Sequence, residues 1–137
     1  IEEIKKTNSK FIIPINFPEA YDVSDPYQAN QMELKDLRFW NQAPSNLKVL
    51  SDNGIVFALT TDKLKKIENF RTNLLLAIKY GYNKTKALEA LTTVPASLLG
   101  KSNEIGSLKT GSQANFVVVS GEIFDEKTTI DTCLTFT

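Results

Sequence analysis

The chain has 137 residues, of which 42% are hydrophobic, and this composition is enough to bury the core of one ordinary globular domain. Its sixteen basic and sixteen acidic residues cancel, so no global field attracts nucleic acid or an anionic membrane. No apolar run approaches the roughly 20 residues of a membrane span, and the first ten residues lack the apolar core of a signal peptide. The sequence therefore predicts no nucleic-acid and no membrane partner, and it leaves a cytoplasmic or periplasmic location open.

The chain contains no histidine and a single cysteine, Cys133. Serine triads, Cys-His pairs and histidine-rich metal sites all need an imidazole, so this chain cannot supply them by itself. A lone cysteine excludes an internal disulfide, and its apolar and threonine-rich surroundings favour a buried or strand thiol over a nucleophile. Much self-contained catalysis is thereby excluded.

The first half of the chain alternates strand and helix signals. IEEIKK is typical of the end of a helix, and FIIPINF (11–17) predicts a strand that Pro14 and Pro18 weaken. The loop EAYDVSDPYQAN comes next, and ELKDLRFWNQA (33–43) predicts a helix with Leu34, Leu37 and Phe39 or Trp40 toward a core. SNLKVLSDNG predicts a short helix with a cap at Ser45 and a glycine stop at Gly54.

An entirely apolar strand, IVFAL (55–59), follows at once, as expected for a parallel strand covered on both faces by helices. The interval of about 35 residues from the first strand allows a right-handed crossover, so the two strands are predicted to be neighbours in one sheet. Three helices then cover the sheet. They are predicted over ENFRTNLLLAIKYG with a stop at Gly81, over NKTKALEALT with a cap at Asn83, and over VPASLLG with Pro95 at the first helical position and a stop at Gly100.

From about residue 101 the pattern changes to glycine punctuation and β-branched runs. FVVV and the alternating KTTIDTCLTFT predict strands, so residues 101–137 are predicted to be β structure, distinct from residues 1–100. The chain begins without methionine on helix-like residues and ends on a strand-like run. It is therefore predicted to be a piece of a longer protein.

The stretch ALEALTTVPASLLGKSNEIGSLKTGSQANFVVVSG resembles the C-terminal signature of the amidohydrolase superfamily, especially the branch near imidazolonepropionases and prolidase-like dipeptidases. Its parts stand in the family's order: T-x-x-P-A-x-x-L-G, with Pro95, Ala96, Leu99 and Gly100, then I-G-S-L-x-x-G over residues 105–111, and then A-N-F-V-V-V. Upstream, GIVFALTTD followed by a long helix matches the family's eighth barrel strand, which extends the resemblance over residues 45–120.

The resemblance implies a mixed α/β fold, namely the last two β/α units of a distorted TIM barrel over 1–100, followed by part of a small β-sandwich over 101–137. FIIPINF would be the seventh barrel strand and IVFAL the eighth. Gly106 and Gly111 would flank a hook whose turns need positive φ, and Leu108 would plug the junction to the sandwich. The implied partners are the remainder of the parent chain and a small-molecule amide or peptide substrate. Exposed edges predict self-association.

The family's chemistry uses one or two divalent metals, often zinc, and an aspartate at the end of the eighth strand that binds metal and takes a proton from the attacking water. Asp62 falls on this position, so the resemblance implies a catalytic and metal-binding role for Asp62 in the intact parent. No metal is expected on this chain alone, because one carboxylate cannot hold a catalytic zinc. Thr60-Thr61-Asp62 departs from the usual Gly-Ser-Asp or Gly-Thr-Asp, and the KLKK that follows leaves a helix-cap role for Asp62 open.

Other polar and aromatic residues have two interpretations each. Asn16 at a strand end is either a substrate contact or a structural hydrogen bond. Glu19, Asp22 and Asp25 line a pocket or form a solvated turn, and the solvated turn is favoured. For the aromatic residues Tyr27, Phe39 and Trp40, packing on or beside a core is favoured over an aromatic wall.

Three functions are open from the sequence. The first is a C-terminal fragment, inactive alone, of a metal-dependent hydrolase of C–N bonds. The second is a noncatalytic, degenerate amidohydrolase half with a structural role. The third is a free-standing small α/β binding module, which predicts four or more parallel strands in one continuous sheet.

Overall fold

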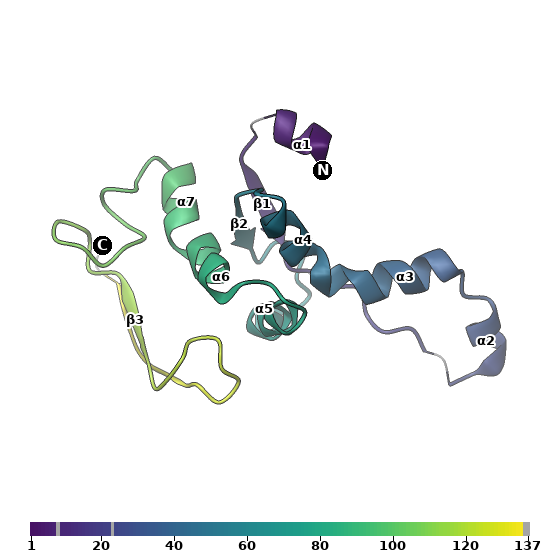
Figure 1. Ribbon diagram of the computed structural model, residues 1–137. Helices are drawn as coiled ribbons and strands as arrows, with labels where there is room; N and C mark the ends of the chain where they lie inside the picture. The colour runs from purple at the N-terminus through teal and green to yellow at the C-terminus, as the bar shows by residue number, and fades with distance from the viewer. Residues whose placement is uncertain (8, 23, 136–137) are drawn as a thin grey trace.

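The computed structural model describes residues 1–7, 9–22 and 24–135, which form a mixed α/β arrangement. The helices are α1 (Glu2–Lys6), α2 (Pro26–Asn30), α3 (Leu34–Gln42), the 3-10 helix η1 (Ala43–Ser45), α4 (Asn46–Asp52), α5 (Asn69–Lys79), α6 (Lys84–Leu91) and α7 (Thr93–Leu98). The strands are β1 (Phe11–Pro14), β2 (Phe57–Thr60), β3 (Phe116–Val119) and β4 (Ile130–Leu134). Figure 1 shows these elements in chain order. None of the helices in this described part is long and apolar enough to cross a membrane.

Strands β1 and β2 pair in parallel, as the sequence predicts. The register runs from Phe11 opposite Phe57 to Pro14 opposite Thr60. Both strands differ in length from the prediction, because β1 ends at Pro14 rather than at residue 17, and β2 begins at Phe57 rather than at residue 55. A proline has no N–H to donate, which explains why the ladder stops there.

One face of this parallel pair carries the core. Phe57 is buried, and Phe11 packs against the same cluster. The cluster of buried residues comprises Ile15, Leu47, Ile55, Phe57, Leu74, Ala77, Tyr82 and Ala87, contributed by the sheet, by helices α4, α5 and α6, and by the loops between them.

The other face is covered only in part, since Ala58 of β2 is buried, whereas Ile12 is 63% exposed and Val56 is 66% exposed. Successive residues of β2, Phe57 and Ala58, are both buried, which agrees with the prediction that this strand is covered on both faces. Strand β1 has one exposed side among the described residues, at Ile12 and Pro14.

The helix ends follow the predicted stop signals. Gly54, Gly81 and Gly100 all have positive φ, between 70° and 97°, where a side chain would be strained. The side-chain oxygen of Asn83 accepts a hydrogen bond of 3.1 Å from the backbone N–H of Lys86, which confirms the predicted cap of α6.

Two predicted start signals are wrong in detail. Ser45 makes no side-chain cap, because η1 runs directly into α4 and Ser45 already has helical φ and ψ of −80° and −10°. Pro95 is the third residue of α7 rather than the first. The third position is tolerated because the N–H groups of a first helical turn have no partner within the helix.

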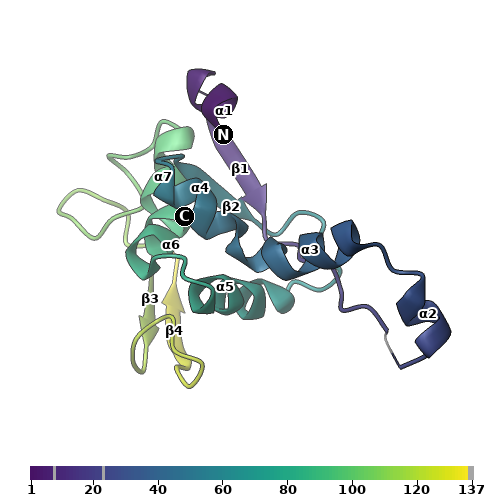
Figure 2. The same cartoon turned by 45° about the vertical axis from the view of Figure 1, so that its right-hand side comes forward.

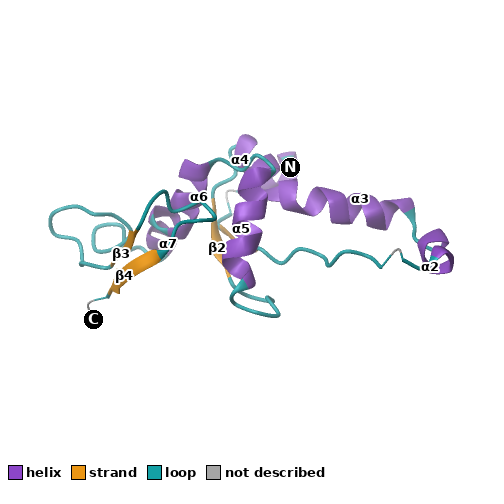
Figure 3. Cartoon of the chain, turned by 90° about the horizontal axis from the view of Figure 1, so that it is seen from below, coloured by secondary structure: helices purple, strands orange, loops and turns teal. Residues whose placement is uncertain are grey.

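Helix α3 projects away from the sheet instead of packing on it (Figures 1 and 3). It has no buried residue, and Leu34 and Phe39 are 61% and 65% exposed. The prediction that its apolar side faces a core is therefore wrong for the described chain. The segment predicted as a loop before it contains a short helix, α2, whose start is capped by the Asp25 carboxylate accepting from the N–H of Tyr27 at 2.9 Å.

Strands β3 and β4 form a second sheet, an antiparallel ribbon with a register shift between Val118 and Val119. Figure 2 shows the ribbon beside α5 and α6. Arg71 of α5 holds its connecting loop, donating to the carbonyl oxygens of Asp125 at 2.7 Å and Thr128 at 3.1 Å. The two sheets do not join among the described residues, so the four parallel strands of a free-standing binding module are not formed there.

Three further expectations concern the C-terminal part. Cys133 lies in β4, as a strand thiol, but it is exposed rather than buried. Leu108 is 81% exposed, so its predicted role as a plug at the junction is wrong for the described chain. The last two residues of the predicted final strand, 136 and 137, lie outside the described residues.

Candidate functional site

Asp62 lies at the carboxyl end of the parallel pair, two residues after β2. Its side chain is exposed, and its backbone N–H donates to the hydroxyl oxygen of Thr60 at 3.2 Å. The chain then turns through Lys63, which has a φ of 60°, a value that residues other than glycine seldom adopt. No helix begins there, since α5 starts only at Asn69 after Glu68, and the helix-cap interpretation of Asp62 is therefore wrong.

The Thr60 hydroxyl has a specific effect on this acid. Glycine, which the related motif often has at this position, carries no hydroxyl to accept the Asp62 N–H. In this chain, Thr60 therefore fixes the backbone of Asp62 where the strand ends. Asp62 thus lies at the carboxyl edge of the parallel pair, which is the edge where β/α barrels build their active sites.

The loops that follow β1 and β2 meet at the same edge. Glu19 accepts a hydrogen bond of 2.6 Å from the ammonium group of Lys65, and this hydrogen bond and the charge of Lys65 lower the pKa of the Glu19 carboxyl. Deeper in, the side-chain amide of Asn73 on α5 donates to the carbonyl oxygen of Ile15 at 2.7 Å and so fixes the chain just after β1.

These residues surround a cavity of about 450 Å³ at the carboxyl edge. Asn16 and Glu19 line it from the loop after β1, Lys65 lines it from the loop after β2, and Asn69 and Asn73 line it from α5. Sequence reasoning did not assign Lys65 or Asn73 to the site. Paired residues of β1 and β2 are 46 positions apart, and so are Glu19 and Lys65. Once the register of the strands is known, this equal spacing predicts that Lys65 lies near Glu19.

The acids after Glu19 form a local turn instead of a pocket. The Asp22 carboxylate accepts from both the N–H and the hydroxyl of Ser24, at 3.0 and 2.6 Å, and these hydrogen bonds lower its pKa. Asp25 caps α2. The solvated-turn interpretation therefore holds for both residues.

Tyr27 is 72% exposed and Phe39 is 65% exposed, so neither is a core residue. Phe39 lines a cavity of about 310 Å³ together with the core residue Leu47.

The side chains present do not fit a catalytic zinc by themselves. Within residues 1–7, 9–22 and 24–135, no three His, Cys, Asp or Glu side chains are grouped so that they could hold a metal ion. A catalytic zinc takes three protein ligands. Asp62 offers a single ligating side chain, so this chain contains no complete zinc site in its described part.

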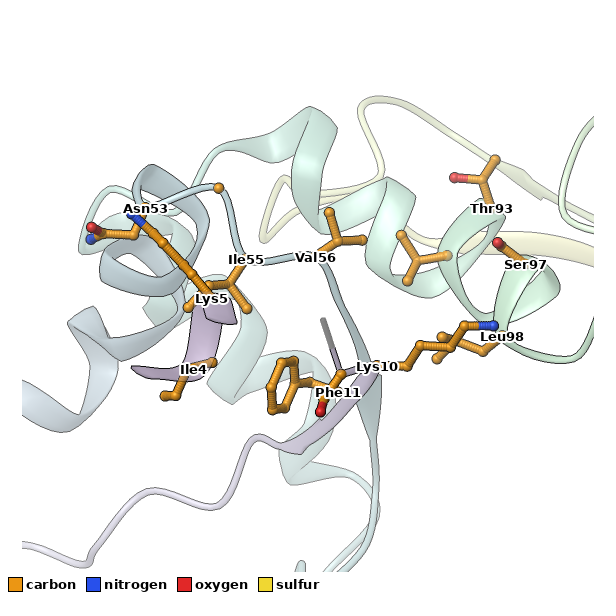
Figure 4. Close-up of a pocket in the computed structure, with 13 residues that line it drawn as sticks. Ile4, Lys5, Lys10, Phe11, Asn53, Ile55, Val56, Thr93, Ser97 and Leu98 are labelled. Carbon is orange, nitrogen blue, oxygen red and sulfur yellow. The ribbon is translucent and has the colours of Figure 1, made fainter. Parts of the chain in front are cut away.

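A larger cavity than the one at the carboxyl edge lies at the opposite end of the sheet. Its volume is about 710 Å³, and α1, the start of β1, the loop before β2 and helix α7 surround it (Figure 4). Its apolar walls include Val56, and its polar lining residues are Lys5, Ser9, Lys10, Asn53, Thr93 and Ser97. It opens at the amino ends of both strands, away from Asp62, so its size alone does not make it the active site.

Two parts of the C-terminal signature touch each other in space. A Cβ built on Gly106 would meet the Cβ of Ala96 at 2.7 Å and the carbonyl oxygen of Thr92 at 2.8 Å. Gly106 and Gly111 both have positive φ, of 86° and 91°, as predicted for the turns of this segment. The motif T-x-x-P-A and the motif I-G-S-L are therefore linked by direct contact between their smallest residues.

Comparisons with known proteins agree with this arrangement. The model of the amidohydrolase family matches residues 37–134. The crystal structure of an amidohydrolase from Thermotoga maritima MSB8 is similar, with 30% identity and a TM-score of 0.60, over 66% of this chain and 24% of that chain. The crystal structure of an uncharacterized protein is also similar in fold, with 17% identity and a TM-score of 0.59, over 90% of this chain and 31% of that chain.

Among proteins of curated function, none matches the chain significantly. The chain spans about a quarter and about a third of the length of the two similar structures. The family model, in contrast, covers well over half of these 137 residues, from α3 to the end of β4. The chain belongs to the amidohydrolase family.

Proposed function

We propose that this chain forms the C-terminal part of a hydrolase that cleaves C–N bonds of amides, cyclic amides or peptides. The observation that carries the proposal is the position of Asp62, an exposed carboxylate two residues beyond β2, at the carboxyl end of a parallel strand pair in a chain of the amidohydrolase family. The chain alone is inactive in this proposal, because a single carboxylate is only part of an active site.

In this proposal β1 and β2 are the seventh and eighth strands of a distorted (β/α)8 barrel, and β3 and β4 belong to a small β-sandwich. The exposed part of one face of the parallel pair supports this assignment. Parallel strands are normally covered on both faces, and here Ile12 and Val56 on one face are both more than 60% exposed, while Ala58, the partner of Ile12, is buried. The proposed partner for this face is the remainder of the barrel, in the parent chain.

Asp62 acts as the proton carrier in the proposed reaction. Its carboxylate accepts a proton from the water whose oxygen attacks the carbonyl carbon, and it returns that proton to the leaving nitrogen as the C–N bond breaks. The Thr60 hydroxyl holds the Asp62 backbone in place for both transfers. By the family resemblance, the parent protein also holds a divalent metal, zinc in our proposal, with its further ligands outside this chain.

The test uses the full-length protein with Asp62→Asn, and with Asp131→Asn, an exposed acid on β4, as the matched control. Asp62→Asn keeps the shape but removes the proton acceptor, so we expect hydrolysis of a small amide to fall by about 100-fold or more. The bound metal, measured by elemental analysis, is expected to fall in the same variant. Asp131→Asn is expected to change neither quantity.

Two results would overturn the proposal. Unchanged hydrolysis and metal content in Asp62→Asn would remove Asp62 from the mechanism. A full-length sequence that lacks an HxH motif on an early strand and two later strand-end histidines would favour the noncatalytic, degenerate half instead.

A further inference from the structure

Asn16 occupies the same position relative to β1 that Asp62 occupies relative to β2. The last paired residues are Pro14 and Thr60, and each of the two polar residues follows two positions later. Both side chains are exposed. In the parallel register, residues opposite each other differ by 46 in number, and Asn16 and Asp62 also differ by 46.

The two chain segments keep this register beyond the sheet. Glu19 and Lys65, which also differ by 46, are joined by an ion pair of 2.6 Å five residues after the strands end. The segments are therefore aligned both at Pro14 with Thr60 and at Glu19 with Lys65. Asn16 and Asp62 lie between these two aligned points, at matching positions on neighbouring segments.

Asn16 is exposed just after β1, next to a fixed point of the chain. Burial alternates from Phe11 to Phe17, so Ile15 is fully buried while Asn16 is exposed. The hydrogen bond from Asn73 to the Ile15 carbonyl oxygen fixes the backbone at this point. Asn16 also lines the cavity of about 450 Å³ at the carboxyl edge, together with Lys65 from the loop after β2.

We propose that Asn16 is a substrate-binding residue, which holds the amide group of the substrate beside Asp62. An asparagine side chain presents one acceptor oxygen and an N–H₂ donor, and an amide with an N–H presents the complementary donor and acceptor. The site thus selects primary and secondary amides over tertiary amides, which have no N–H to give to the Asn16 oxygen. This inference rests on the proposed function and adds the substrate class to it.

The kinetic test compares substrates that differ only in one N-methyl group. The probes are N-acetylglycine against N-acetylsarcosine and glycylglycine against glycylsarcosine, hydrolysed by the full-length protein. We expect the wild type to prefer the N–H substrate by at least tenfold in kcat/KM. Asn16→Ala and the nearly isosteric Asn16→Leu are expected to lose that preference, with a loss of about 10-fold to 100-fold on the N–H substrate alone.

The matched control is Asn41→Ala, an exposed asparagine on α3, which is expected to keep both the rate and the preference. If Asp62→Asn abolishes hydrolysis while Asn16→Ala keeps the preference, the Asn16 inference is overturned and the proposed function stands. If the wild type hydrolyses none of the four probes, both the inference and the proposed function for this substrate class are overturned. If Asn16 has only a structural role, its variants lose kcat/KM equally on both members of a pair. That result also overturns the inference.

A second measurement tests the geometry without any activity. In the full-length protein with Cys133→Ser, the pair Asn16→Cys and Asp62→Cys is oxidised mildly and the disulfide is mapped on its peptides. A disulfide needs Cα atoms roughly 4.4 to 6.8 Å apart, so residues side by side on neighbouring segments form it readily. The pair Asn41→Cys and Asp62→Cys is expected to stay reduced. Failure of the first pair to cross-link overturns the inference.

Discussion

The contact of Gly106 with Ala96 explains why two separated motifs occur together in this chain. Gly106 has a positive φ and lies so close to α7 that any side chain would overlap the Ala96 methyl group and the Thr92 carbonyl oxygen. Gly111 has the same backbone conformation, but a Cβ atom added to it would meet nothing within 4 Å. A substitution at Gly111 therefore reports the cost of backbone conformation alone. A substitution at Gly106 reports that cost together with the cost of overpacking.

We therefore expect Gly106→Ala to destabilise the protein by about 3 kcal/mol, from backbone strain and overpacking together. Gly111→Ala is expected to lower the free energy of unfolding by only about 1 kcal/mol, from backbone strain alone. Urea unfolding of both variants gives the two values. Equal losses in the two variants would show that the contact with Ala96 contributes nothing.

Single residues were predictable where one local rule decides the conformation. The glycine stops at Gly54, Gly81 and Gly100 and the cap at Asn83 follow from the backbone freedom of glycine and from the side-chain oxygen of asparagine. Ser45 has the same local signal as a cap but makes no such hydrogen bond, because the preceding 3-10 helix satisfies the turn. Whether a serine caps a helix thus depends on the structure of the residues before it. The local sequence pattern around the serine does not reveal that structure.

At the scale of elements, Tyr82 links the sheet to the helix layer. It follows α5, its ring stacks on Phe57 of β2 with centroids 5.9 Å apart, and its hydroxyl donates to the carbonyl oxygen of Lys86 at 3.1 Å. Burial, together with the negative charge of Glu89, raises the pKa of Tyr82 to about 12 from its ordinary value of 10.0. The phenol is thus kept neutral by the packing of α6 and β2.

A pH dependence of stability follows from this shift. The folded protein holds the Tyr82 proton more tightly than the unfolded chain, so its contribution to stability is complete below pH 10. We expect the free energy of unfolding to fall as the pH rises from about 10 to about 12. Tyr82→Phe is expected to lower stability by about 1 kcal/mol at pH 8, from the lost hydrogen bond, and to flatten the alkaline decline. If the free energy of unfolding falls equally in this variant, the alkaline loss of stability comes from other groups, such as the lysines.

The pairing of elements was predictable and the direction of α3 was not. Apolar strand runs separated by a crossover of sufficient length led to the parallel pair of β1 and β2, which is observed. The pattern of α3 indicates an apolar side, but the pattern does not say what covers it. In the described chain that side faces solvent, with Leu34 61% exposed.

The Asp62 position was also predictable, since an abrupt end of an apolar strand followed by an acid marks a strand terminus. Its neighbours were not, because Lys65 and Asn73 reach the site only through the pairing of loops and the packing of α5. Such contacts between distant segments leave no local pattern.

At the scale of the whole molecule, the chain exposes more apolar surface than a self-sufficient domain normally does. One face of the parallel pair is open at Ile12 and Val56, and every described residue of β4 is exposed. Open sheet edges and apolar faces recruit other chains. These exposed surfaces support the expectation that the isolated chain self-associates.

We expect the isolated chain with Cys133→Ser to form dimers or larger species in light scattering at micromolar concentration. Cys133 is exposed, so its replacement removes intermolecular disulfides as an alternative cause. Ile12→Lys together with Val56→Lys places charge on the open face and is expected to lower the average mass. A monodisperse monomer before these two substitutions would count against a cut barrel.

The constant offset between the segments after β1 and β2 also constrains how related sequences can differ in length. Inserting one residue between Pro14 and Glu19 would shift Glu19 away from Lys65 while leaving the strands paired. The part of the crossover that contains the projecting helices α2 and α3, in contrast, has no buried residue in α3 and can lengthen without disturbing this edge. Relatives that keep the same active edge are therefore expected to place their insertions and deletions in the crossover and to have none in the two short segments of equal length, 14–19 and 60–65.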